Sequence, residues 1–180
     1  MRQMLFLAVL ALAGCAVTPT STTTSTTLNP ADAATSLMVG GPVTLTTTTP
    51  TAAAQNGEDP AIVITLARAD GRTMSFEQAN HAPYDLAVQT PGGPLAQTMG
   101  LMQGQEQPVY YHARAGADGA AFICGAAGPQ NLGIYTAPDG AVTVYGLSSG
   151  FQVESGANGA MDVAPFSPDH ICARLHFTKS

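Results

Sequence analysis

Ser148 is the residue of this chain whose neighbours most directly suggest a chemical reaction. It stands at the centre of Gly146-Leu147-Ser148-Ser149-Gly150, a G-x-S-x-G frame, and acidic residues and histidines follow it (Asp162, Asp169, His170 and His176). A serine in this frame is activated only on a sharp turn between a strand and a helix, beside an oxyanion loop. Phe151 to Glu154, which come next, have the composition of another strand. We therefore expect a glycine-rich connection between strands, with a hydrolase that uses Ser148 and a histidine as the alternative.

The histidines are the second group with chemical potential. His112, His170 and His176 could converge on a zinc or copper ion, with Asp118 or Asp169 beside them. The sequence contains no H-x-x-x-H or H-E-x-x-H pair, and its four histidines are widely separated. No phosphate-binding glycine motif occurs either. We expect no metal site and no cofactor.

Two adjacent tyrosines are the third group. Tyr110 and Tyr111 follow Val109 in a β-prone segment. Successive side chains of a strand point to opposite faces, so one ring should face the core and the other the surface. Because an exposed tyrosine offers apolar area and a hydroxyl together, Tyr110 or Tyr111 is a candidate binding anchor.

Charge excludes one class of partner. Only 10% of the 180 residues are charged, the formal net charge is -6, and the six basic residues are scattered, with Lys179 as the single lysine. Nucleic-acid binding needs a basic patch that neutralises phosphates. We expect no nucleic-acid partner.

The N-terminus has the pattern of an export signal. One arginine precedes residues 4–13 (MLFLAVLALA), an uninterrupted apolar run of ten, whereas a bilayer span needs roughly twenty. A short basic region followed by such a run is typical of a signal peptide, here residues 1–14. The run Leu12-Ala13-Gly14-Cys15 resembles the lipobox of bacterial lipoproteins. The resemblance implies cleavage between Gly14 and Cys15 and fatty acyl chains on Cys15.

That resemblance also implies a compartment. An aspartate after the lipidated cysteine is associated with retention in the inner membrane of enterobacteria, and this chain has Ala16. We therefore expect an outer-membrane anchor that faces the periplasm. Export to an oxidising compartment leaves Cys124 and Cys172 as the remaining pair for a disulfide. The alternative is a thiol enzyme in which Cys124 or Cys172 is activated by a histidine.

Residues 15–60 are rich in Thr, Pro and Ala, and no aromatic residue occurs between Phe6 and Phe76. A segment this poor in large apolar groups is expected to stay extended as a tether, because it cannot offset its chain entropy by burial. Two short apolar runs are the exception. Leu37 to Val39 and Val43 to Leu45 could add an edge strand to the folded domain.

Residues 61–180 form the expected β domain. Asp-Gly pairs stand between strand-like runs twice, at Asp70-Gly71 and Asp139-Gly140, and this pair is typical of type I′ hairpins. Further strands are expected at residues 84–89, 109–113, 121–124, 151–154 and 172–178, and one helix from Pro94 to Gly104. Short strands with Gly and Pro between them predict a small antiparallel β-sandwich or barrel with at most one short helix, preceded by the tether.

The resulting functional expectation is a lipid-anchored envelope protein of a bacterium. Its β domain would act as a non-catalytic binding or structural module for an envelope protein or polymer. The alternative is the small hydrolase or thiol enzyme that uses Ser148 or Cys124.

Overall fold

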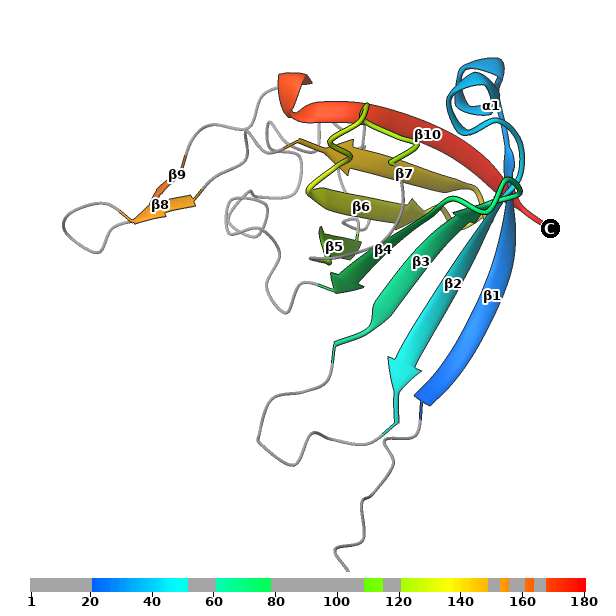
Figure 1. Cartoon of the computed structure of the whole chain (residues 1–180), viewed down its shortest axis with the longest axis horizontal. Helices are drawn as coiled ribbons and strands as arrows, with labels where there is room; N and C mark the ends of the chain where they lie inside the picture. The colour runs from blue at the N-terminus through cyan, green and yellow to red at the C-terminus, as the bar shows by residue number, and fades with distance from the viewer. Residues whose placement is uncertain are drawn as a thin grey trace, which may run out of the picture.

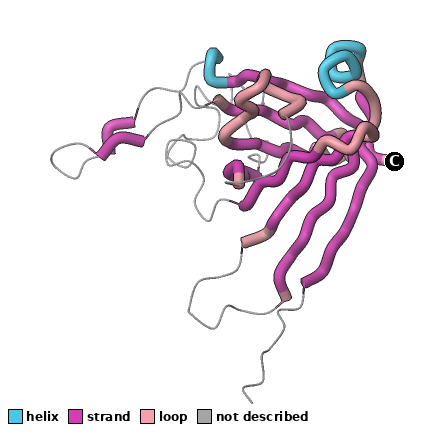
Figure 2. Tube along the Cα trace, in the orientation of Figure 1, coloured by secondary structure: helices cyan, strands magenta, loops and turns pink. Residues whose placement is uncertain are grey.

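The computed structural model describes residues 21–51, 61–78, 109–114, 121–148, 153–155, 161–163 and 168–180 (Figure 1). Eight antiparallel strands close a barrel in the order β1-β10-β7-β6-β5-β4-β3-β2. Figure 2 shows that strands make up most of this part of the chain. The mainly β prediction with one short helix is confirmed, and the architecture is the barrel.

The barrel strands are β1 (Ser21–Pro30), β2 (Val43–Pro50), β3 (Val63–Arg68), β4 (Thr73–Gln78), β5 (Val109–Ala113), β6 (Asn131–Thr136), β7 (Val142–Leu147) and β10 (Ile171–Lys179). Helix α1 (Ala33–Val39) joins β1 to β2. The short strands β8 (Val153–Ser155) and β9 (Met161–Val163) pair with each other, and a 3-10 turn, Pro168–His170, precedes β10.

Both Asp-Gly hairpins are confirmed, as β3–β4 and β6–β7. In each turn the aspartate side chain accepts a hydrogen bond from the backbone N–H two residues later, at 3.1 Å for Asp70 and 3.0 Å for Asp139. The type I′ expectation is wrong, because only the glycine of each pair has positive φ, 87° at both Gly71 and Gly140. A single left-handed glycine after a tight turn is the geometry of a longer hairpin loop.

The tether prediction is wrong for residues 21–50, which form β1, α1 and β2. β1 and β2 pair over eight residue pairs, from Ser21↔Pro50 to Leu28↔Val43. Threonine is β-branched and suits a pleated strand, and Leu28 and Val43 bury themselves in the core. The folded domain therefore begins no later than Ser21. The suspected edge strand is also corrected, since residues 37–39 are helical and β2 is paired on both sides.

Helix α1 is capped by Asp32 and is fixed to β10 through Thr35 and through Ala31, which precedes the helix. The Asp32 carboxylate accepts a hydrogen bond from the Thr35 N–H at 2.6 Å, which caps the N-terminus of the helix. The buried Thr35 hydroxyl accepts from the His176 N–H at 2.9 Å, and the Ala31 N–H donates to the His176 carbonyl at 2.8 Å. The helix thus satisfies backbone groups of β10 beyond the point where β1 stops pairing.

Large apolar side chains are buried in the described part of the domain. The fully buried ones include Phe76, Leu28, Ile64, Ile123, Leu132, Leu147, Leu175, Val39, Val43 and Val142. Arg68 extends over the Phe122 ring at 5.6 Å and pairs with the Asp70 carboxylate at 3.0 Å. A Cβ on Gly40 would lie 2.6 Å from the Arg68 guanidinium. The arginine therefore packs between the end of α1 and the segment that precedes β6.

Residues 121–124, which precede β6, were expected to form a strand and form a bend instead. Cys124 and Gly125 have φ of 60° and 71°, and two consecutive left-handed residues end an extended chain. Phe122 and Ile123 are nevertheless buried in the core. The strand expected at 84–89 and the helix expected at Pro94–Gly104 lie outside the described residues.

Acid should weaken the cap of α1. Hydrogen bonds from Thr35, and to a smaller extent the charge of His176, hold the pKa of Asp32 below its ordinary value. A group with a lowered pKa in the folded state stabilises above its unfolded pKa, about 3.9 for aspartate, and this contribution is lost as pH falls through the folded pKa. We expect the wild type to be more stable than Asp32→Asn at neutral pH, and the gap to close in acid.

Thermal unfolding midpoints of the two proteins, measured from neutral pH to below the usual aspartate pKa, check this. Asparagine still caps a helix, and Asp70, whose pKa is lowered by hydrogen bonds from Arg72, titrates in both proteins. The difference between the two curves therefore isolates Asp32. A gap that stays constant on acidification would contradict the assignment.

Candidate functional site

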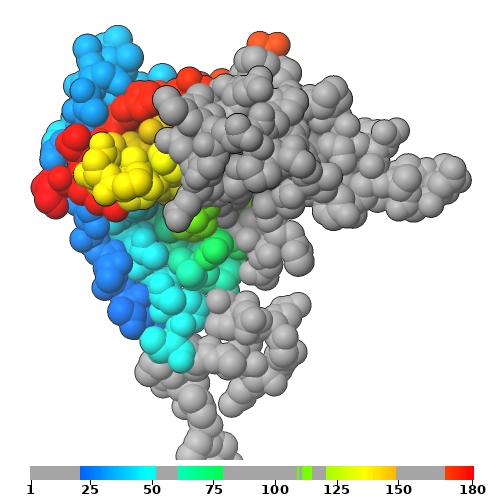
Figure 3. All heavy atoms as spheres, turned by 180° about the vertical axis from the view of Figure 1, so that it is seen from behind, coloured from blue at the N-terminus to red at the C-terminus, as the bar shows by residue number. Residues whose placement is uncertain are grey.

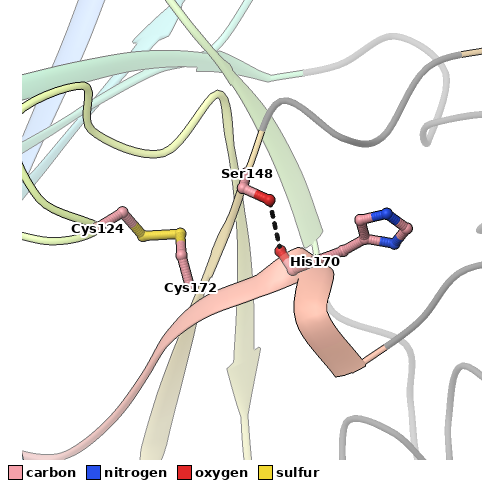
Figure 4. Close-up of a disulfide and its surroundings, with 4 residues drawn as sticks. All are labelled: Cys124, Ser148, His170 and Cys172. Atoms are coloured by element: carbon pink, nitrogen blue, oxygen red, sulfur yellow. Dashed lines mark hydrogen bonds between the residues drawn. A yellow bond between two sulfur atoms is a disulfide. The ribbon is translucent and has the colours of Figure 1, made fainter.

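Cys124 and Cys172 form a disulfide, as predicted, between the bend before β6 and strand β10 (Figure 4). Their Cα atoms are 5.1 Å apart and 48 positions separate them in sequence. Both sulfurs are therefore used in a covalent link in this structure. A thiol-enzyme mechanism needs a free thiolate, so Cys124 and Cys172 are not nucleophiles in this oxidised state.

Gly146, the first glycine of the G-x-S-x-G frame, lies directly against the disulfide. A Cβ on Gly146 would be 2.5 Å from the Cys124 Sγ, 3.3 Å from the Cys172 Sγ and 3.2 Å from the Ala173 Cβ. No real Cβ tolerates the first distance without a shift of the sulfur. The glycine is thus explained by close packing inside strand β7, without a nucleophile turn.

Ser148 follows the end of β7, and its hydrogen bonds go to backbone. Its N–H and its hydroxyl both donate to the carbonyl oxygen of His170, at 2.9 Å and 3.4 Å. Figure 4 shows the imidazole of His170 directed away from the Ser148 hydroxyl. A nucleophilic serine needs a base within hydrogen-bond reach of its hydroxyl, and His170 does not occupy that place here.

The histidines of the described ranges lie on separate elements with different partners. His112 of β5 is hydrogen-bonded through its Nδ1 to the Asn131 side chain, and His176 of β10 lies 3.3 Å from the Thr143 hydroxyl. Within these ranges no three His, Cys, Asp or Glu side chains gather as metal ligands would. The structure does not bring His112, His170 and His176 together.

Of the two candidate anchors, Tyr111 belongs to the core side of β5. It is half-buried, packs against the hydrophobic core, and burial raises the pKa of its hydroxyl. The backbone of Tyr110 pairs with that of Gly133 in β6. Its side chain lies outside the described part, so its role as an anchor stays a prediction. Cys15 and Gly14 also lie outside the described residues.

Among the described residues, a small pocket opens between β4, the end of β5 and the bend. Its volume is about 140 Å³, and its lining includes Thr73, Ser75, Arg114 and Pro129. Ligand sites for drug-sized molecules have volumes of about 300 to 1,000 Å³. Arg114, which lies 3.7 Å from the Glu77 carboxylate, is already paired at its rim. The pocket does not make a small-molecule site of ordinary size.

The outer face of β1 to β4 carries a surface that the sequence interpretation missed. Cross-strand neighbours place hydroxyls side by side in the row Ser25, Thr46, Thr65 and Ser75. The Ser25 and Thr46 hydroxyls are 3.0 Å apart, as are those of Thr65 and Ser75. The sequence signal for this face was the threonines at positions 44, 46 and 48, every second residue of the strand. Because residue 47 is also threonine, the sequence did not show which residues face outward.

No protein-family model, no curated protein and no solved structure matches this chain. In the described part of the chain, none of the helices has the length and apolarity to cross a bilayer.

The disulfide should be present in the oxidised protein and should stabilise it. Closing a loop of 48 positions contributes about 4 kcal/mol by the chain-entropy estimate. We expect Cys124→Ala/Cys172→Ala to lower the free energy of unfolding by roughly that amount, measured by denaturant titration. Thiol titration of the denatured wild type should find neither cysteine free. Two reactive thiols from these positions would contradict the bridge.

Replacement of Gly146 should be costly only while the sulfurs are present. We expect Gly146→Ala to destabilise the barrel by about 1 to 3 kcal/mol, the usual cost of overpacking. In the Cys124→Ala/Cys172→Ala background the same change should cost less, because the closest atoms are gone. Denaturant titrations of the four proteins form a double-mutant cycle, with Thr143→Ala on the same strand as a control whose cost should be the same in both backgrounds. Equal costs in the two backgrounds would show that the disulfide is not what excludes a side chain.

Proposed function

We propose that this chain is a lipid-anchored protein of a bacterial envelope, acylated at Cys15, whose β barrel is a non-catalytic binding or structural module. The observation that carries the proposal is the Cys124–Cys172 disulfide. Disulfides persist in oxidising compartments such as the periplasm. The bond therefore agrees with the export that the lipobox-like run Leu12-Ala13-Gly14-Cys15 predicts.

The apolar core favours a role for the outer surface. Barrels that carry small ligands keep a cavity between their strands, whereas in the described part of this barrel Phe76, Leu132 and Leu175 are fully buried in one apolar cluster. A partner would then be contacted on the outside of the wall or on the loops. An envelope protein or polymer is the partner class that such a surface fits.

The surroundings of Ser148 and Cys124 support a module over an enzyme. The Ser148 hydroxyl is bonded to a carbonyl and Cys124 to another sulfur. Both groups have structural partners, and the glycine beside them is required by packing. The alternative hydrolase or thiol enzyme would need these partners to be released before either group could react.

The lipid anchor is tested by the mass of the mature N-terminus. The full chain, expressed in a Gram-negative host, should fractionate with membranes and begin at Cys15 with acyl chains attached. Each buried CH₂ of such a chain contributes about 0.8 kcal/mol, so two or three chains hold a protein durably. Cys15→Ala should lose the acyl groups and leave the membrane fraction. A mature protein that begins at Met1, or an unmodified Cys15, would overturn the proposal. Cofractionation with outer-membrane markers tests which membrane holds it.

A further inference from the structure

The end of the β1–β2 hairpin that lies farthest from α1, called the tip below, contributes no side chain to the buried core. We call Ser21–Ser25 of β1 and Thr46–Pro50 of β2 the hydroxyl ribbon; nine of its ten residues are Ser or Thr, and none is charged. All five residues on the β1 side are exposed. Because successive side chains of a strand alternate between faces, hydroxyls cover both faces of the ribbon.

The hydroxyl ribbon lies at the opposite end of the hairpin from α1. The ladder between β1 and β2 begins at Ser21↔Pro50 and ends at Leu28↔Val43, and α1 follows that end. Eight residues at about 3.3 Å each make the hairpin about 25 Å long. Figures 1 and 3, seen from opposite sides, both show the helix at the top and the tip of β1 and β2 at the bottom.

The link from the proposed anchor to the hydroxyl ribbon is short. Cys15 precedes Ser21 by six positions. A fully extended chain covers at most about 3.6 Å per residue, so Ser21 lies within about 22 Å of the acylated cysteine. A flexible chain of six residues has a root-mean-square length of about 13 Å. The long stalk expected from the sequence is replaced by β1 itself, and the barrel cannot stand far from the bilayer.

We infer that the hydroxyl ribbon docks on the headgroups of the bilayer that holds Cys15, with α1 directed away from the membrane. This inference rests on the lipid anchor proposed above. A short tether supplies an effective concentration in the millimolar range. Individually weak contacts at the tip are then sufficient to orient the barrel.

The chemistry of the ribbon fits headgroups and excludes deeper insertion. Each hydroxyl offers one donor and two acceptor positions, which suit phosphate and ester oxygens and their water. Among the described residues, β10 pairs only with Leu28–Pro30 of β1, so no strand covers the edge of Ser21–Thr26. Unpaired strand edges do not enter hydrocarbon, where backbone polar groups have no partner. The ribbon therefore stays at headgroup depth, and its lack of charge makes docking insensitive to anionic lipid.

The absence of tryptophan from the sequence makes a direct test possible. A single introduced tryptophan is a unique reporter of distance to quenchers in the bilayer. We choose Thr49→Trp in the hydroxyl ribbon, Thr22→Trp directly across from it as a second reporter, and Leu37→Trp in α1 as the control. Leu37 has a side chain that is 88% exposed, so its replacement does not disturb the core. Each full-length lipidated variant is reconstituted into phosphatidylcholine vesicles with a nitroxide on the headgroup or deep in the acyl chain.

We expect the headgroup nitroxide to remove most of the fluorescence of the two ribbon reporters, the deep nitroxide to have little effect, and Leu37→Trp to be unaffected by either. Circular dichroism confirms that each variant is folded. Vesicle-bound protein in which the ribbon and α1 reporters are quenched equally, or not at all, would overturn the docking and leave the anchor in place. Quenching by the deep nitroxide would replace docking by insertion. Protein that lacks acyl chains and stays off the vesicles would overturn both proposals.

Discussion

Three residue pairs join the first strand of the barrel to the last: Leu28, Asn29 and Pro30 face Lys179, Thr178 and Phe177. Without this ladder β1 and β10 would be the open edges of a sheet, with unpaired backbone groups and a core exposed to water. The contact also joins residues that are very distant in sequence, because 153 positions separate Thr27 from its hydrogen-bond partner Ser180. Helix α1 extends this junction between β1 and β10, because the Thr35 hydroxyl accepts a hydrogen bond from the His176 N–H, which β1 leaves unpaired.

β10 is held on a second side by covalent chemistry. The disulfide links it to the bend that places Phe122 and Ile123 in the core, and the two sulfurs pack over the bare backbone of Gly146 in β7. One strand is thus fastened to β1, to α1, to β7 and to the bend. This arrangement explains residues that looked catalytic in sequence. The glycine, the serine and the cysteine of the suspected sites are all components of the same packed junction.

The wall of the barrel has two chemically different parts. Around the core, inward positions are large and apolar, and the outward ones are largely Thr and Ser on β1 to β4. In the hydroxyl ribbon even the inward positions, such as Thr24 and its partner Thr47, carry hydroxyls, and Thr49 and Pro50 extend beyond the last pair with β3, Thr48↔Val63. The β-branched threonines favour strand formation here, but none of the ribbon side chains belongs to the buried core. Contact with a polar, uncharged environment outside the protein is the role that its chemistry fits.

Local sequence patterns determined the elements whose signals are complete within about ten residues: the β3–β4 and β6–β7 hairpins, strands β5 and β10, and the single disulfide once export was assumed. They failed where the deciding contact was remote. The Thr-rich segment 21–50 has too few apolar residues to predict folding by itself, and it becomes β1, α1 and β2 only because Leu28 and Val43 find a core built from other strands. Likewise, Gly146 and Ser148 match a nucleophile motif in one dimension, and only the tertiary structure places a disulfide and the carbonyl of His170 beside them. Sequence specifies which residues can form a strand or a turn, whereas barrel closure decides which strands meet, because pairing distant segments depends on the free energy of the whole core.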